Sequence, residues 1–444
     1  MKITLIRPNI GRLEHSLFVD EARMEPLELA VLAGLSPPGV EVAMYDDRLE
    51  GIPYDEPTDL AAISVQTFTA RRAYEIAAKY RRRGVPVILG GMHPTLAPEE
   101  AARHADAVYL GDAEGLWPQV VADARAGKLR PVYQASIGVP HPGVRPDRSV
   151  YRGKRYLPIT LLQFGRGCLH GCTYCATGAY SGRTHHLRPV AEVVAEIEGQ
   201  PRRGLFFVDD NIVADHRAAK ELFQALIPLK IRWVSQASID MTWDRELMEL
   251  MARSGCLGQV IGFESLDARN LEGVRKEPNL VSATRRYREE LAILRDYGLQ
   301  TWAAFTLGYD HDTVEGIEEL LEFAVENRFT FAAFNVLMPY PGTPFYRDLE
   351  REGRLLYDGA WWLHPEYRFN FAAFRPKRMS AEELTEVGAH CRRRFNSPGS
   401  LLFRLFDLKT NLRSPLRFGI YLAYTPLFRR ETFKKHGMRL GLSR

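Results

Sequence analysis

The sequence has little cysteine and no long apolar run. Its 444 residues include five cysteines, an odd number, which excludes a secreted disulfide scaffold. The apolar stretch at residues 418–428 is about half the ~18–20 residues that a membrane span needs. The apolar run at residues 3–6 is too short for a signal peptide. We therefore expect a protein of the reducing cytosol.

The net charge is also small, and the formal value of +4 selects no class of partner. The charge is unevenly distributed, because residues 391–444 hold 13 lysine and arginine residues but only two acids. The remaining residues are acidic overall. With 45% hydrophobic and 26% charged residues the composition is that of a globular protein, and the length predicts two or three domains.

Short apolar runs alternate with helical patterns in the first part of the chain. Continuous apolar strands separated by helices predict an α/β domain with a doubly wound, flavodoxin-like parallel sheet, which binds ligands at the carboxyl ends of its strands. We assign residues 1–130 to this domain and residues 131–157, rich in Pro, Gly, Arg and Tyr, to a linker. The expected strands are residues 3–6, 40–45, 60–65, 85–89 and 107–110.

A second series of strands and helices follows. Six βα units over about 190 residues predict a partial (β/α)6 TIM-like barrel rather than a closed eightfold one. We place this barrel at residues 158–350 and a helical, basic C-terminal region at residues 351–444. The expected strands of the barrel are residues 159–163, 204–208, 233–237, 259–263, 302–307 and 331–338.

Three cysteines stand together directly after the first barrel strand. Cys168, Cys172 and Cys175 have the spacing Cys-x3-Cys-x2-Cys. Thiolates select iron–sulfur clusters, zinc or copper, and a closed zinc site or cluster takes four protein ligands. Cys256 and Cys391 have no partner cysteine nearby and are expected to be ordinary half-buried thiols. Three ligands on one loop favour a four-iron cluster with one open iron; a zinc or structural cluster site is the alternative.

With Tyr174 before its last cysteine, this loop resembles that of the radical S-adenosylmethionine (SAM) superfamily. Residues 207–211, 261–265 and 340–345 resemble segments of that family that follow the second, fourth and sixth barrel strands. The fourth-strand segment helps to hold the adenosyl moiety in the family. The resemblance covers roughly residues 1–380.

The N-terminal domain is similar to the cobalamin-binding domain of the cobalamin-dependent subgroup. Its sequences Gly-Gly-Met-His-Pro-Thr at 90–95 and Gly-Asp-Ala-Glu at 111–114 correspond to loops of that subgroup.

Two motifs of this sequence differ from those of the family and the subgroup. Val208-Asp209-Asp210 replaces the Gly-Gly-Glu that contacts the methionine ammonium, a role that either aspartate could take. The Asp-x-His-x-x-Gly motif is absent, since residues 46–51 have its spacing but carry Arg48 in place of histidine, so no axial histidine is offered.

The resemblance implies a 4Fe–4S cluster on the three cysteines, together with SAM and cobalamin. The residues implied to bind these two cofactors are Gly90, Gly91, His93, Thr95, Tyr174, Asp209, Asp210, Glu264 and Ser265. Each has a structural alternative. The glycines could form a tight turn, His93 could pack or cap, the aspartates could cap the next helix, and Glu264 could form an ion pair. His185 and His186 are expected in a surface or substrate groove.

The implied activity is reductive cleavage of SAM to methionine and a 5′-deoxyadenosyl radical, which abstracts hydrogen from a substrate. With methylcobalamin bound, the enzyme is a methyltransferase acting on an unactivated carbon. The alternatives are a similar radical enzyme that performs cyclisation, sulfur insertion or rearrangement, and a non-enzymatic electron carrier. The expected partners are a small-molecule or lipid-like substrate and a reductant such as ferredoxin or flavodoxin, with no nucleic acid.

The basic C-terminal region leaves two interpretations open. Its apolar and aromatic residues interleave with arginine and lysine, and this pattern suits peripheral contact with an anionic membrane surface. It also suits a helical cap on the barrel with solvated basic ends. Nucleic-acid binding is a weaker third interpretation, because no recognition motif accompanies the charge.

Overall fold

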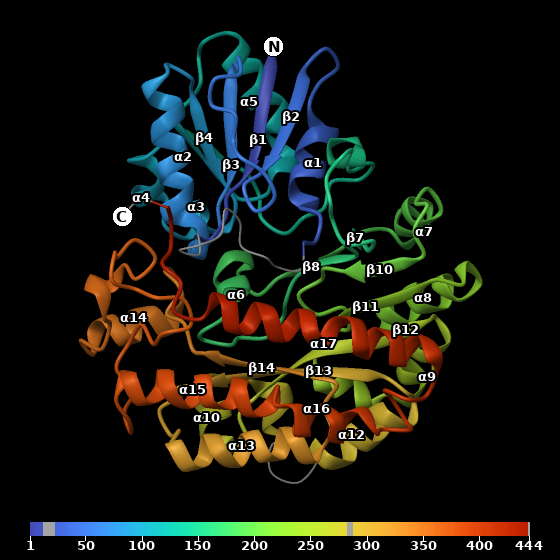
Figure 1. Ribbon diagram of the computed structural model, residues 1–444. Helices are drawn as coiled ribbons and strands as arrows, with labels where there is room; N and C mark the ends of the chain where they lie inside the picture. The colour runs from blue at the N-terminus through green and yellow to red at the C-terminus, as the bar shows by residue number, and fades with distance from the viewer. Residues whose placement is uncertain (12–22, 282–286, 443–444) are drawn as a thin grey trace.

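The computed structural model describes residues 1–11, 23–281 and 287–442. Two six-stranded parallel sheets dominate it, one above the other in Figure 1. Arg444, counted in the basic C-terminal region, lies outside the described residues. Within the described residues, no helix combines the length and the apolar character required to cross a bilayer.

The first sheet has the strand order β2-β1-β3-β4-β5-β6, the order of a flavodoxin-like doubly wound sheet with one strand added. Four of its strands are apolar and largely buried, as a sheet covered on both faces requires. The strands are β1 (Lys2–Arg7), β2 (Glu41–Asp46), β3 (Leu60–Ser64), β4 (Val87–Gly90), β5 (Ala107–Leu110) and β6 (Val132–Gln134). The sheet thus runs past residue 130, because β6 pairs with β5 inside the segment expected to be a linker.

Helices cover both faces of this sheet. Helices α1 (Leu27–Leu35) and α5 (Trp117–Arg125) pack on one face, where Leu29 and Val120 are fully buried. Helix α2 (Ala70–Arg82) packs on the other face, next to the short helices α3 (Met92–Leu96) and α4 (Pro98–Ala102).

The second sheet has the order β14-β13-β12-β11-β10-β7, in which each strand lies beside its predecessor in the series. Strands β7 and β14 do not pair with each other, so the sheet is the open, partial (β/α)6 barrel predicted from the sequence. The strands are β7 (Thr160–Leu162), β10 (Gly204–Phe207), β11 (Arg232–Ala237), β12 (Cys256–Glu264), β13 (Gln300–Leu307) and β14 (Phe331–Val336).

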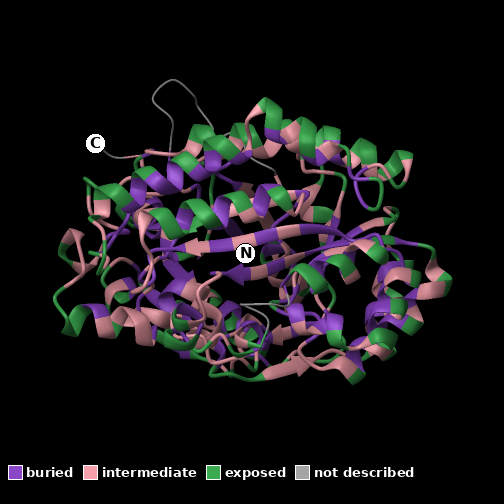
Figure 2. Ribbon diagram, turned by 90° about the horizontal axis from the view of Figure 1, so that it is seen from below, coloured by how far each residue is buried: buried purple, intermediate pink, exposed green. Residues whose placement is uncertain are grey.

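Amphipathic helices cover the outer face of this partial barrel. In Figure 2 the strands are mostly buried, while the helices turn exposed residues outward. Cys256 and Cys391 belong to this core and are 2% and 0% exposed, so they are fully rather than half-buried. The helices are α7 (Val190–Glu198), α8 (His216–Leu226), α9 (Arg245–Arg253), α10 (Ala268–Gly273), α11 (Glu277–Leu280), α12 (Tyr287–Asp296) and α13 (Val314–Glu326).

The C-terminal region is a helical cap on the barrel. Its helices are α14 (Pro344–Arg351), α15 (Ala381–Phe395), α16 (Pro398–Leu405) and α17 (Pro415–Lys435). Helix α17 runs beside β13 and β14 (Figure 1), where the ring of Phe428 lies 4.3 Å from that of Trp302 and 4.9 Å from that of Phe331. The chain then returns to the first sheet, where the N–H of Gly441 donates to the carbonyl of Ile10.

Candidate functional site

The three motif cysteines lie on a loop between the two strands of a small hairpin. The hairpin consists of β8 (Gly165–Gly167) and β9 (His185–Leu187), and the loop carries the short helix α6 (Ala176–Ser181). Two backbone hydrogen bonds fix its centre, because Thr173 donates to the carbonyl of Val274 and accepts from the N–H of Phe345. The loop is therefore held against the segments that follow the fourth and sixth barrel strands.

All three motif cysteines are free, partly exposed thiols. Burial raises the pKa of the Cys172 thiol to about 11, and the thiols of Cys168 and Cys175 are close enough to contribute. Among the described residues, no three His, Cys, Asp or Glu side chains converge on a point that could hold one metal ion. The thiolates of an iron–sulfur cluster bind different iron atoms, so they do not need to converge in this way. Three neighbouring free thiols on a glycine-containing loop fit such a cluster.

A largely buried ion pair lies beside this loop. Glu264 ends β12 after a β-bulge and has a φ of +63°, a backbone conformation that non-glycine residues rarely adopt. Its carboxylate accepts from the Thr306 hydroxyl at 2.6 Å and from Lys276 at 3.3 Å. A Cβ at Gly262 would collide with this carboxylate, so the glycine leaves space for it. The ion-pair alternative for Glu264 is thus present in the structure.

Lys276 belongs to this site and was not singled out from the sequence. Burial lowers the pKa of its ammonium, but Glu264 and the thiols of Cys172 and Cys175 outweigh burial and leave the pKa above its ordinary value. The side chain is therefore a cation held next to the cysteine loop. No sequence signal marks it, because burial of a lysine in a polar segment depends on the tertiary fold.

The two aspartates after β10 have different surroundings. Asp209 is fully buried and accepts hydrogen bonds from the backbone N–H groups of Phe164 and Gly165, so it fixes the turn between β7 and β8. Asp210 is exposed and accepts from the N–H of Gly167 and the hydroxyl of Thr177. Neither caps the next helix.

That cap is Asp215, whose side chain accepts from the N–H of Ala218 at the start of α8. The capping alternative for Asp209 and Asp210 is therefore wrong. Only Asp210 leaves its carboxylate accessible to a ligand, because Asp209 is 0% exposed.

The buried Asp209 carboxyl makes a testable contribution to the pH dependence of stability. Burial raises its pKa from 3.8 to about 7. Between these values the folded state binds the proton more tightly than the unfolded state, so stability falls as pH rises through this window. Asp209→Asn cannot ionise. We expect the Tm of the variant minus that of the wild type to increase from pH 5 to pH 8. A constant Tm difference would show that Asp209 is already ionised at pH 5.

A cavity of about 370 Å³ opens at the carboxyl edge of the first sheet. Its apolar wall comes from α1, α5 and the sheet, including Leu27, Ile88 and Trp117. Gly90 and Gly91 are among the residues that line it. Gly91 has a φ of +105°, and a Cβ there would approach the carbonyl oxygen of Val65 to 2.9 Å, so this turn requires glycine.

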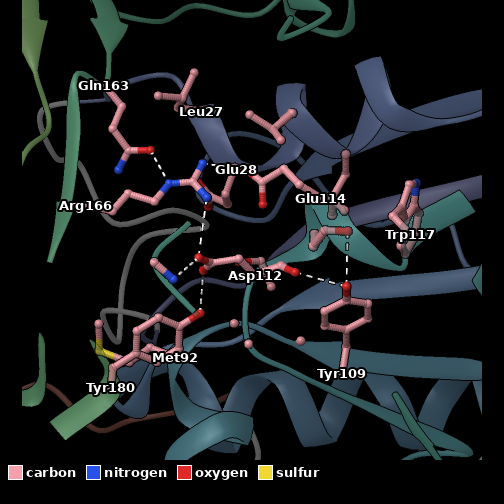
Figure 3. A pocket seen from close by; sticks show the side chains of 18 of the residues that line it. Leu27, Glu28, Met92, Tyr109, Asp112, Glu114, Trp117, Gln163, Arg166 and Tyr180 are labelled. Atoms are coloured by element: carbon pink, nitrogen blue, oxygen red, sulfur yellow. Dashed lines mark hydrogen bonds and ion pairs between the residues drawn. The ribbon is translucent and has the colours of Figure 1, made fainter. Parts of the chain in front are cut away.

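The same cavity is bounded by the cysteine hairpin. Arg166, two residues before Cys168, forms ion pairs with Glu114 and, at 3.4 Å, with Asp112 (Figure 3). The Tyr180 hydroxyl on α6 donates to the other oxygen of Asp112 at 2.7 Å. Arg166 also donates to the Gln163 side chain. The bonds to Asp112 and Glu114 join the loop at residues 111–114 of the first sheet directly to the cysteine hairpin. Sequence reasoning missed Arg166, although its position next to the motif was a usable signal.

His93 and Thr95 lie behind this cavity rather than in its lining. His93 is 0% exposed, and its two ring nitrogens contact Thr67 Oγ1 at 3.3 Å and Glu100 at 3.1 Å. The Thr95 hydroxyl donates to the Gly91 carbonyl and accepts from the Gly111 N–H, so it ties two glycine loops together. In these positions, His93 and Thr95 stabilise the glycine loops next to the cavity.

No histidine is among the described residues that line the cavity. Asp46 and Arg48, at the Asp and His positions of the missing cobalamin motif, are buried and paired with each other, and Asp47 pairs with Arg72.

Tyr174 and Ser265 complete the predicted set. Tyr174 lines a second cavity, of about 330 Å³, together with Phe68 of the first domain and Thr306 and Tyr340 of the barrel. Ser265 is buried, and its hydroxyl accepts from the N–H of Asp267, which stabilises the turn after β12. His185 and His186 form β9 and are partly exposed on the hairpin.

Comparisons with known proteins agree with this geometry. The family model of the radical SAM superfamily matches residues 162–324, and that of the B12 binding domain matches residues 21–121. Bacteriochlorophyllide d C-12(1)-methyltransferase from Chlorobaculum tepidum is 29% identical over 87% of this chain and 85% of its own. These matches imply a 4Fe–4S cluster, SAM and cobalamin as cofactors.

Two solved structures share the fold. The radical SAM methyltransferase TsrM from Kitasatospora setae, solved with cobalamin and a 4Fe–4S cluster, superposes with a TM-score of 0.62 at 17% identity and covers 79% of this chain and 75% of its own. The cobalamin-dependent radical enzyme OxsB, solved with aqua-cobalamin, superposes with a TM-score of 0.64 at 14% identity. The match covers 97% of this chain and 72% of OxsB. The chain therefore combines a radical SAM domain with a B12 binding domain.

Proposed function

We propose that this protein is a cobalamin-dependent methyltransferase that modifies an unactivated carbon of a small molecule. The observation that carries the proposal is the shared wall of the first cavity. Arg166 and Tyr180 from the cysteine hairpin, and Asp112 and Glu114 from the first sheet, form one bonded cluster at its rim. A corrin in this cavity and a cluster on the cysteine loop would therefore be neighbours.

When bound, the reduced cluster supplies the electron that cleaves SAM to methionine and a 5′-deoxyadenosyl radical, and methylcobalamin supplies the methyl group. The chain would position these groups. We assign Cys168, Cys172 and Cys175 as the cluster ligands, and the exposed Asp210 carboxylate as the acceptor for the methionine ammonium. Glu264, held in its strained conformation at the end of β12, would orient the adenosyl moiety.

The cavity beside Tyr174 suits radical chemistry. Its lining includes Phe68 of the first domain together with Met338, Tyr340 and Tyr367. An aromatic, mostly apolar lining limits the access of water to a reactive intermediate. We propose that the substrate carbon is placed here, between the two cofactor regions. We also propose that a small protein reductant such as ferredoxin or flavodoxin delivers the electron.

The experiment uses SAM with a deuterated methyl group. The reconstituted, cobalamin-loaded protein is incubated anaerobically with dithionite and a metabolite extract of its source organism. We expect one metabolite to gain the labelled methyl group, in proportion to the 5′-deoxyadenosine formed. Formation of 5′-deoxyadenosine with an unlabelled product would instead favour the alternative, a cyclisation, sulfur insertion or rearrangement without corrin.

We further propose that the C-terminal region contacts an anionic membrane surface. Exposed apolar side chains there lie near the exposed cations Lys409 and Arg413 in sequence, a combination that binds anionic lipid. These side chains are Leu402, Phe403, Phe406, Leu408 and Leu416.

The double variant Phe406→Ser/Leu408→Ser is expected to reduce co-sedimentation with phosphatidylcholine–phosphatidylglycerol vesicles several-fold, because both side chains would be lost from the membrane contact. Val132→Ser, which removes an exposed apolar residue of the first sheet, is the control. Equal sedimentation of both variants and the wild type would contradict the contact.

A further inference from the structure

A third cavity, of about 250 Å³, lies between the edge of the barrel and its helical cap. Strand β14 forms one side, and helices α15, α16 and α17 form the others. Aromatic residues, among them Trp302, Phe331 and Phe428, make up much of the wall. The charged residues of the lining are Arg392, Arg404, Glu431 and Lys435. Glu431 and Lys435 each interact with other groups.

Arg392 differs from the other charged residues of this cavity in its hydrogen bonding. The residue is 6% exposed, and one guanidinium nitrogen donates to the carbonyl of Phe334 at 2.7 Å. The other terminal nitrogen, Nη2, is buried without a hydrogen-bond partner in the described part of the chain. Burial lowers the pKa of this guanidinium to about 10, an effect that the neighbouring Cys391 thiol only partly offsets. A buried cation without a counter-ion is costly, and an anion would offset that cost.

Arg404 adds a second buried cation to the same wall. Its guanidinium lies 3.7 Å from the centre of the Phe395 ring. It donates to three backbone carbonyls and to Ser400, so its hydrogen bonds are satisfied, but no carboxylate among these partners neutralises its charge. The wall therefore carries two buried guanidinium groups, those of Arg392 and Arg404, that have no carboxylate partner among their hydrogen bonds.

This basic cavity adjoins the aromatic cavity beside the cysteine loop. Asn335, Phe369 and Asn370 line both. A ligand that occupies the two cavities together would place one end near Tyr174 and the other near Arg392. The first end meets mostly aromatic and apolar groups, and the second meets the wall that carries Arg392.

We propose that the substrate is an amphipathic anion whose carboxylate or phosphate binds Arg392 while its apolar body extends toward Tyr174. The proposal rests on the function proposed above, since it takes the aromatic cavity as the place of reaction. It gives Arg392 the role of a substrate-binding residue that sets which end of the molecule reaches the cysteine loop.

The test compares acids with their neutral partners. Binding of chlorophyllide a and its methyl ester, and of farnesyl diphosphate and farnesol, is measured by calorimetry on the cluster-loaded protein. The two pairs distinguish a tetrapyrrole carboxylate from an isoprenoid diphosphate. Arg392→Gln is compared with Arg392→Lys and with Arg393→Gln, which removes an exposed charge from the same helix. Thermal melting confirms that each variant is folded.

We expect at least one acid to bind the wild type and Arg393→Gln about 10- to 100-fold more tightly than its neutral partner, as a charged hydrogen bond predicts. Arg392→Gln should lose this preference and Arg392→Lys should retain part of it. Equal affinity for acid and neutral partner, no binding of either acid, or an unchanged preference in Arg392→Gln would overturn the proposal. Cleavage of SAM by the wild type is assayed separately, so a failure of the proposed function is recognised independently of binding.

Discussion

Replacing Cys172 by alanine is expected to remove the iron–sulfur cluster and to reduce 5′-deoxyadenosine formation below detection. The physical reason is that a four-iron cluster with one open iron has no spare protein ligand, so loss of one thiolate leaves two on a loop. Iron and sulfide content and the visible absorbance of the anaerobically reconstituted protein measure the first effect. Chromatography of the reaction with SAM and dithionite measures the second.

The matched control is Cys256→Ala. This thiol is buried in β12 and contacts the carbonyl of Gly258, away from the cysteine loop in sequence. Its removal should cost about 1 kcal/mol of stability through a small cavity and leave the cluster intact. Full iron content in the Cys172 variant, or loss of iron in the Cys256 variant, would contradict the assignment of the ligands.

Replacing Ser64 by tryptophan is expected to weaken cobalamin binding by at least about 100-fold, because the indole would occupy the cavity that the corrin cofactor must enter. Ser64 ends β3 and lines the cavity at the carboxyl edge of the first sheet. Methyl transfer should be lost with the cobalamin. SAM cleavage should persist, since the cysteine loop is unchanged. Corrin absorbance after gel filtration and 5′-deoxyadenosine formation are the two readouts.

Ser64→Ala serves as the control, because it removes the hydroxyl without adding volume. It should bind cobalamin as the wild type does. If Ser64→Trp keeps its corrin absorbance, the cavity at the sheet edge is not the binding site. If it loses SAM cleavage as well, the substitution has disturbed the barrel and the two functions are not separable at this position.

Much of this architecture could be predicted from the sequence, because it depends on local pattern. Apolar runs of four to six residues separated by helical periodicity predict parallel strands. The same pattern gives the order of the βα units along the chain. Strand β6 was missed because its three residues, Val132–Gln134, include two that are exposed. Such a short edge strand has no buried alternation for the pattern to reveal.

The candidate site was predictable only where a motif fixes it. The cysteine spacing and the glycine loops identify two regions, but not which side chains enter the cavities. The resemblance of residues 90–95 to a cobalamin-binding loop implied that His93 binds a cofactor, with packing or capping as the alternative. Tertiary packing directs its ring to Glu100 and Thr67. Lys276 and Arg392 carried no signal, since their burial results from contacts between elements distant in sequence.

In the basic C-terminal region too, the sequence does not reveal which side chains are buried. Its charge suggested a solvated surface, and several of its cations are exposed. Arg392 and Arg404 are instead 6% and 1% exposed and face a cavity. A net charge counts residues without their positions, so it could not distinguish a surface for membranes from the wall of a binding site.

The most direct test of the account is the anaerobic reaction of the reconstituted wild-type protein with SAM and dithionite. The measured quantity is 5′-deoxyadenosine, determined by mass spectrometry and compared between the wild type and single alanine variants of Cys168, Cys172 and Cys175. We predict that the wild type forms 5′-deoxyadenosine and that each of the three variants forms none. A wild-type protein that holds a full cluster but releases no 5′-deoxyadenosine would contradict the account.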